Sequence, residues 1–269
     1  MDLNLGEGFT PHFGKFIEQL PILIEAGEKP ISVDIALAKQ FAFPETWGVT
    51  YIFTGDVAIT GVKGDVVIEL DSPTLLSHVI KDSQGYHWQG KLNKGVSEES
   101  KELWEEAKSN KNNLYLTQSQ VYEADGNGYV KKKGVWQPEN KSVAEVLNTL
   151  ARGRDLQEHA ELAFQKSNSA ERVLDLHFDK GLRQKPTMRA WFVDTLKIRS
   201  YVGGGSYLDY TGSRLVGVTL KALEQAQSDI YNSTKFSSIL RKGLQQYVAP
   251  ANLEEVVKYI TALTTMKDQ

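Results

Sequence analysis

The segment RSYVGGGSYLDYTGSRL, residues 199–215, combines residue types that bind phosphate groups. Three consecutive glycines, Gly203–Gly205, leave backbone amides accessible to an anion, and arginines and tyrosines flank them. The segment matches neither of two common nucleotide-binding motifs. A dinucleotide fingerprint needs a glycine where Leu208 stands, and a P-loop needs a lysine that the run GSR at 212–214 lacks.

A weaker anion site is predicted at the end of this segment. Ser213 can cap a helix that begins at Arg214, and the free amides of a helix N-terminus favour an anion. An acidic ligand would also offset the charge of Arg214, which is poorly placed against the helix dipole. The simpler alternative is a mobile connector with a capping serine.

Basic residues and tyrosines also precede the glycines. Apolar residues at helical spacing predict a helix starting at Thr187, and an extended Lys197–Val202 would place Lys197, Arg199 and Tyr201 on one side. Such residues make surfaces that contact phosphates and stack bases, although a pI near 6.0 is low for a nucleic-acid-binding domain. The predicted ligand-binding residues are Arg189, Lys197, Arg199, Tyr201, Gly204, Tyr207, Ser213 and Arg214.

The run DLHFD, residues 175–179, is the candidate for catalysis. Apolar residues alternate there with Asp175, His177 and Asp179, so a strand would present a carboxylate–imidazole–carboxylate face for acid–base or metal chemistry. Alternate residues stand roughly 7 Å apart, so all three cannot close on one ion unaided. The alternative is a solvated strand with His177 held by a carboxylate. No metal and no cofactor are predicted.

The composition excludes several classes of site. Without cysteine there are no disulfides, thiolate nucleophiles or sulfur-ligated metals, and a reducing compartment is expected. The first residues do not have the pattern of a signal peptide, and no apolar run approaches the roughly 20 residues of a membrane span. The sequence therefore predicts a soluble cytoplasmic protein with no membrane partner.

Charge is distributed unevenly along the chain. Residues 1–90 hold 12 acidic and 5 basic side chains, whereas residues 151–269 hold 17 basic and 13 acidic ones. All eight arginines lie between Arg152 and Arg241. Arginine suits bidentate recognition of anions, so an acidic partner is expected in the second half. The alternative is an acidic face that docks on a basic one, within the chain, on a protein partner or in a homo-oligomer.

Local patterns predict the elements that carry these residues. Residues 47–73 read as antiparallel strands with turns at Gly55–Asp56 and Gly64–Asp65, and residues 114–136 read as a hairpin turning at 125–128. Helical periodicity dominates after Pro138 and continues to the end of the chain. The predicted fold is α+β. Residues 1–140 are expected to form an antiparallel sheet with flanking helices, and residues 141–269 a helix-rich region. The two regions can also pack together as one domain.

These observations predict a non-enzymatic binding or interaction protein that contacts nucleic acid or another phosphate-bearing partner through residues 180–214. Two alternatives stay open. One is an enzyme that acts on a phosphorylated or nucleotide substrate, with a lid at residues 203–212 and His177 as its acid or base. The other is a structural assembly subunit.

Overall fold

The computed structural model describes residues 5–93, 96–167, 171–210, 214–229 and 256. Residues 1–222 form one compact unit, and residues 223–269 form a second. Helices and strands are mixed along the described chain, which confirms the α+β prediction. No helix in these ranges is both long and apolar enough to cross a bilayer.

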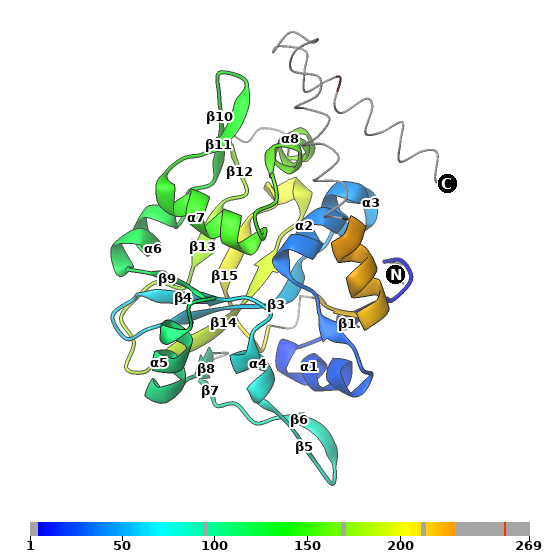
Figure 1. Cartoon of the computed structure of the whole chain (residues 1–269), viewed down its shortest axis with the longest axis vertical. Coiled ribbons are helices and arrows are strands. Elements are labelled where there is room, and N and C mark those ends of the chain that lie inside the picture. Colours follow the sequence, from blue (N-terminus) through cyan, green and yellow to red (C-terminus); the bar gives the residue numbers. More distant parts are fainter. Residues whose placement is uncertain (1–4, 94–95, 168–170, 211–213, 230–255, 257–269) are drawn as a thin grey trace. The chain divides into compact units, whose positions relative to one another are not determined.

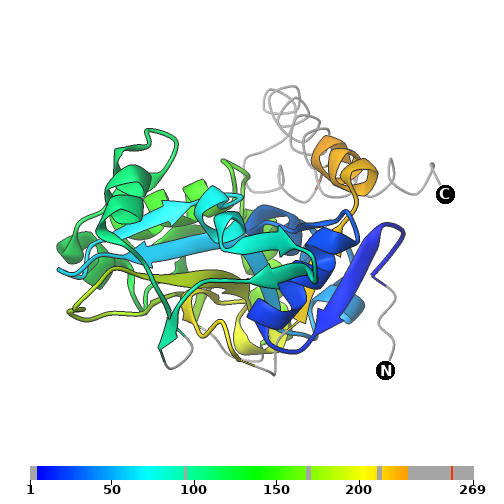
Figure 2. The same cartoon turned by 90° about the horizontal axis from the view of Figure 1, so that it is seen from below.

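A large mixed sheet forms the centre of the first unit. Its strands lie in the order β1 (Phe9–Phe13), β16 (Arg214–Val218), β3 (Ile52–Thr60), β14 (Thr187–Val193), β15 (Val202–Ser206) and β13 (Leu176–Phe178). Shorter strands extend it: β2 (Lys29–Pro30), β4 (Val66–Glu69), β7 (Leu92–Asn93), β8 (Val96–Glu98) and β9 (Leu114–Leu116). The pairs β16–β3 and β13–β15 are parallel. Figure 2 shows β3 and β4 in blue and cyan beside the yellow-green β14.

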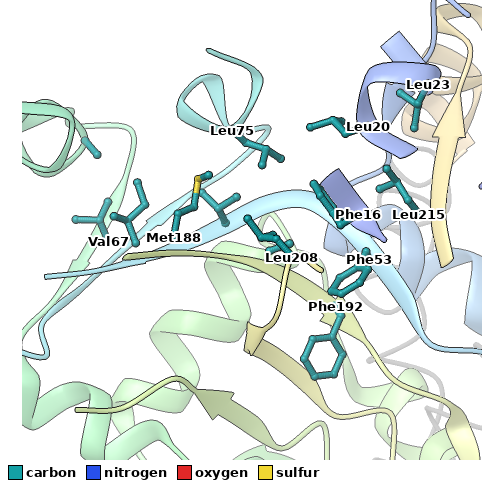
Figure 3. Close-up of a cluster of buried hydrophobic side chains, with 14 of the residues drawn as sticks. Phe16, Leu20, Leu23, Phe53, Val67, Leu75, Met188, Phe192, Leu208 and Leu215 are labelled. Atoms are coloured by element: carbon teal, nitrogen blue, oxygen red, sulfur yellow. The ribbon is translucent and has the colours of Figure 1, made fainter. Parts of the chain in front are cut away.

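Helices pack on this sheet in two groups (Figure 1). The lower group in that view is α1 (Phe16–Glu25), α4 (Pro73–Ser77) and α5 (Lys101–Ser109). The upper group is α2 (Val33–Ala42), α3 (Pro44–Trp47), α6 (Gln118–Ala124), α7 (Lys141–Leu150) and α8 (Gln157–Lys166). Apolar side chains of the lower group meet Phe53, Met188, Phe192 and Leu215 of the sheet in a buried core (Figure 3).

Two small sheets complete the unit. One contains β10 (Tyr129–Lys132), β11 (Val135–Pro138) and β12 (Arg172–Val173), and the other is the hairpin β5 (Val79–Asp82) and β6 (Gly85–Trp88). The hairpin predicted for 114–136 is wrong, because the capping box of Thr117 and Gln120 starts helix α6 there. The actual turn of the β10–β11 hairpin lies at Lys133 and Gly134, both with positive φ.

Residues 172–218 form strands β12 to β16, whereas the sequence predicts a helix-rich second half. The helix predicted at Thr187 is wrong: all seven residues of β14 are buried, and a strand covered on both faces loses the alternation that identifies strands. The Gly55–Asp56 turn is also wrong, because both residues lie inside the buried strand β3. The joint predicted near residue 140 stays a prediction, and strands from both sides of it, β3 and β14, pair directly.

Candidate functional site

The three glycines of the opening segment belong to strand β15 rather than to a loop. A Cβ atom on Gly203 would lie 2.3 Å from the Phe192 ring, and one on Gly204 would lie 2.8 Å from the Trp191 ring. Successive residues of a strand face opposite sides, so these glycines admit a large aromatic ring on each face of the sheet. Their role in the fold is therefore close packing.

The helix-terminus anion site predicted at Ser213 and Arg214 does not form as expected. Arg214 opens strand β16, and the next helix starts at Leu220. Ser213 lies outside the described residues, and the helical periodicity predicted beyond residue 229 also falls outside them except at Val256. The Arg214 guanidinium is largely buried 4.6 Å from the Phe13 ring centre, and this burial lowers the pKa of Arg214.

Arg189 is buried on strand β14, where it forms ion pairs rather than a free cationic surface. Its Nε atom donates to Asp179 Oδ2 at 2.8 Å, and its guanidinium lies 4.4 Å from the ring centre of Tyr207. Arg183 also pairs with Asp179. Two cations thus hold the Asp179 carboxylate, which makes it a structural anchor for this part of the sheet.

The remaining predicted cations, Lys197 and Arg199, line an open polar pocket of 520 Å³. They lie on a tight turn: a short 3₁₀ segment, Leu196–Ile198, is followed by Arg199 and Ser200 with φ values of 68° and 53°. The turn is therefore not the extended strand predicted from sequence. The pocket is lined by Val130, Glu139, Ser167, Glu171, Arg172, Lys197, Ile198 and Arg199.

A buried chain of hydrogen bonds holds the turn at residues 196–200 in place. Ser200 Oγ donates to Gln40 Oε1 at 2.8 Å and lies 2.9 Å from His159 Nε2, and Gln40 Nε2 donates to the backbone oxygen of Asp194. Burial, reinforced by the nearby Arg154 charge, lowers the pKa of His159 to about 3. His159 is therefore a neutral hydrogen-bonding support for the pocket turn rather than an acid or base.

Carboxylates orient two of the pocket cations. Arg172 contacts Glu139 through Nε at 2.5 Å and NH2 at 2.8 Å, and Arg199 NH1 lies 3.2 Å from Asp175 Oδ2. Burial opposes the charge on Glu139, but the hydrogen bonds from Arg172 and the Gly128 amide outweigh it and lower the pKa of Glu139. With three cations and two glutamates, the lining carries one net positive charge.

The DLHFD run forms the predicted alternating strand but not a convergent catalytic site. Leu176 and Phe178 are buried, and His177 points to the other face, where its ring centre lies 4.8 Å from that of Tyr201. Asp175 and Asp179 pair with different arginines. Among the described residues, no group of three or more histidines and carboxylates is placed to hold a metal ion.

The structure thus distributes the predicted basic surface among separate places. Lys197 and Arg199 share the pocket, Arg189 is buried with Asp179, and Arg214 is buried beside Phe13. Sequence reasoning missed Arg172 as a pocket residue. The sequence around Arg172 gives little indication of this role, because the other two pocket cations, Lys197 and Arg199, lie on a turn more than twenty residues further along the chain.

Histidine–carboxylate pairs were also missed, because their partners are distant in sequence. His78 Nε2 lies 3.2 Å from Glu99 Oε2, and the imidazole stacks on Trp88 of the β5–β6 hairpin with ring centres 5.1 Å apart. Burial opposes protonation of His78, but the hydrogen bond and charge of Glu99 outweigh it and raise the pKa of His78.

Replacing His78 by glutamine is expected to destabilise the fold in a pH-dependent way. A histidine with a raised folded-state pKa contributes stability that is complete below its unfolded value and is lost as the pH rises through the folded value. Urea unfolding should therefore show a loss of about 1 kcal/mol at pH 6 that shrinks by pH 9. His87→Gln, at a partly exposed histidine 3.7 Å from Asp82, is the matched control. A deficit that stays equal at both pH values would contradict this role.

Comparisons with known proteins relate this chain to one fold. No family model matches the sequence, and no curated protein matches it. A solved structure from a study named "Accommodation of massive sequence variation in Nanoarchaeota by the C-type lectin fold" is similar, with a TM-score of 0.50 and 11% sequence identity. The match covers 78% of this chain and 96% of the other. At this identity the likeness concerns the fold alone.

Proposed function

We propose that this protein is a non-enzymatic binding protein that holds a phosphate-bearing group of its partner in the pocket of Arg172, Lys197 and Arg199. The convergence of these three cations, from β12 and from the turn before β15, is the observation that carries the proposal. Guanidinium groups match phosphate geometry through paired N–H donors, and Glu139 and Asp175 hold the two arginines in fixed orientations.

The fold likeness supports a binding role. The similar protein's study describes a C-type lectin fold that accommodates massive sequence variation. A fold that tolerates sequence variation is suited to recognition, since binding residues commonly lie on loops held by a rigid core. In this chain the pocket turn at residues 196–200 is such a loop, anchored by buried Ser200.

The charge pairing favours binding over catalysis. Asp175 and Asp179, the predicted acid–base partners of His177, are each occupied by arginine. Burial also raises the pKa of Asp175, although Arg199 opposes the shift. In the described part of the chain both carboxylates form their ion pairs with arginines and not with His177, which favours a structural role for them. The enzyme and the assembly subunit stay alternative predictions.

Charge reversal at Lys197 tests the proposal without disturbing the fold. Lys197 is exposed, and Lys197→Glu should weaken binding of inorganic pyrophosphate about tenfold, because it places a like charge against the ligand. Isothermal titration calorimetry at two salt concentrations measures the change. Lys101→Glu, the same reversal on exposed α5, is the control and should bind as the wild type does. Absent wild-type binding, or equal affinities of Lys197→Glu and wild type, would overturn the proposal.

A further inference from the structure

A row of neighbouring aromatic rings, three of them partly exposed, lies along the main sheet. The ring centres of His177 and Tyr201 are 4.8 Å apart, and those of Tyr201 and Phe192 are 5.4 Å apart. Tyr51 stacks on Phe192 with centres at 4.2 Å. His177, Tyr201 and Tyr51 are partly exposed, whereas Phe192 is buried beneath them.

The pocket and the aromatic row are connected through neighbouring residues. Asp175, which lies 3.2 Å from pocket residue Arg199, stands two positions before His177. Arg199 in turn stands two positions before Tyr201. The pairing of Leu176 with Val202 brings these two segments side by side. A ligand group held by Arg199 would therefore lie near the rings of His177 and Tyr201.

The geometry of the two partly exposed rings, His177 and Tyr201, suits a flat ligand. The His177 and Tyr201 planes meet at 78°, so a planar ring can stack on one of them while its edge meets the other. Gly203, paired with His177 across the two strands, has no side chain of its own, and the Phe192 ring occupies that position beside Tyr201. Asp175 is already paired with Arg199, so its charge is offset where a phosphate would approach.

We propose that the ligand is a nucleotide unit, with its phosphate in the pocket and its base stacked at the corner of His177 and Tyr201. This inference rests on the proposed function and names the ligand class. Proteins that bind single-stranded nucleic acid combine cationic grooves with aromatic rings, and each stacked base contributes about 1–3 kcal/mol. A free nucleotide and a single strand of nucleic acid both offer a phosphate and a base for these contacts.

Binding of four probes to the full chain tests the inference: inorganic pyrophosphate, a nucleoside monophosphate, a short single-stranded oligothymidylate and an abasic strand of equal length. His177→Ala and Tyr201→Leu should each weaken binding of the base-bearing probe at least fivefold and leave pyrophosphate binding unchanged. Tyr201→Phe, which keeps the ring, should bind as the wild type does and guards against a folding defect. Tyr122→Leu, at an exposed tyrosine on α6, is the matched control.

Each outcome decides the inference. If base-bearing probes bind no more tightly than pyrophosphate and the abasic strand, or if Tyr201→Leu equals the wild type, the base site is overturned while the phosphate pocket stands. If no probe binds, both proposals fail. If the base-bearing probes bind more tightly and Tyr201→Leu weakens them, the inference holds. The monophosphate then identifies a free nucleotide, and binding of the oligonucleotide alone identifies a single strand.

Discussion

Replacing Arg152 by alanine is expected to lower the free energy of unfolding by about 3 kcal/mol, the lower end of the range for a broken buried ion pair. The Arg152 guanidinium lies 2.5 Å from Asp34 Oδ1, 3.3 Å from Asp56 Oδ1 and 2.9 Å from Asp71 Oδ2. Asp56 is fully buried in β3, so without Arg152 its carboxyl must either stay charged without a cation or take up a proton. A quarter of the Arg152 side chain is exposed, which limits the loss.

The deficit of the Arg152→Ala variant should grow with pH. Burial raises the pKa of Asp56 to about 6, and the Arg152 charge opposes that shift, so removing Arg152 raises the pKa further. A carboxyl whose folded-state pKa exceeds its unfolded value costs stability as the pH rises from the unfolded value to the folded one. In the variant, Asp56 therefore lowers the free energy of unfolding over a wider pH range than in the wild type.

Urea unfolding at pH 5, 6.5 and 8 measures both effects. Lys131→Ala, which breaks the exposed Lys131–Glu161 pair at 2.8 Å, is the control and should cost less than about 1 kcal/mol. Adding Asp56→Asn to Arg152→Ala should flatten the pH dependence, because it removes the titrating group. A loss in Arg152→Ala no larger than the control's, or one that shrinks with pH, would show that the buried carboxylates do not depend on this arginine.

Replacing Gly203 by alanine should destabilise the fold by about 1–3 kcal/mol, the range for overpacking a core. The new Cβ would meet the Cε1 and Cζ atoms of Phe192 at 2.3 Å, and Phe192 is held between Phe53, Tyr51 and Tyr201. The ring cannot move without disturbing these neighbours. Thermal and urea unfolding measure the loss.

A double variant tests whether the Phe192 ring causes this loss. Phe192→Leu alone should be destabilising, but combined with Gly203→Ala it should cost less than the sum of the two single changes, because the smaller side chain leaves room for the methyl group. Strictly additive losses would mean that the Phe192 ring does not cause the destabilisation of Gly203→Ala.

Local sequence patterns predicted those elements whose causes lie within a few residues. A serine followed by a proline predicts a helix start at Ser72 and Pro73; helix α4 begins there, and Ser72 Oγ accepts a hydrogen bond from the Leu75 amide at 2.9 Å. The alternation around His177 gives strand β13, with apolar residues buried and the histidine on the other face. Lys197 and Arg199 were predicted as ligand residues from their charge and from an extended segment with Tyr201; they line one pocket, although the segment is a turn.

Only the tertiary structure decided how distant segments combine. Arg152 meets carboxylates 118 and 96 residues away, and no local pattern encodes such pairing. Strand β14 is buried on both faces, so its residues show no polar–apolar alternation and mimic helical spacing. The sequence by itself determined where some helices start, where polar and apolar residues alternate along a strand, and the excess of basic residues in the second half. The glycine-rich segment is a strand in which Gly203 and Gly204 leave room for the Phe192 and Trp191 rings. This role could not be predicted locally, because the glycines and the rings are not neighbours in the chain.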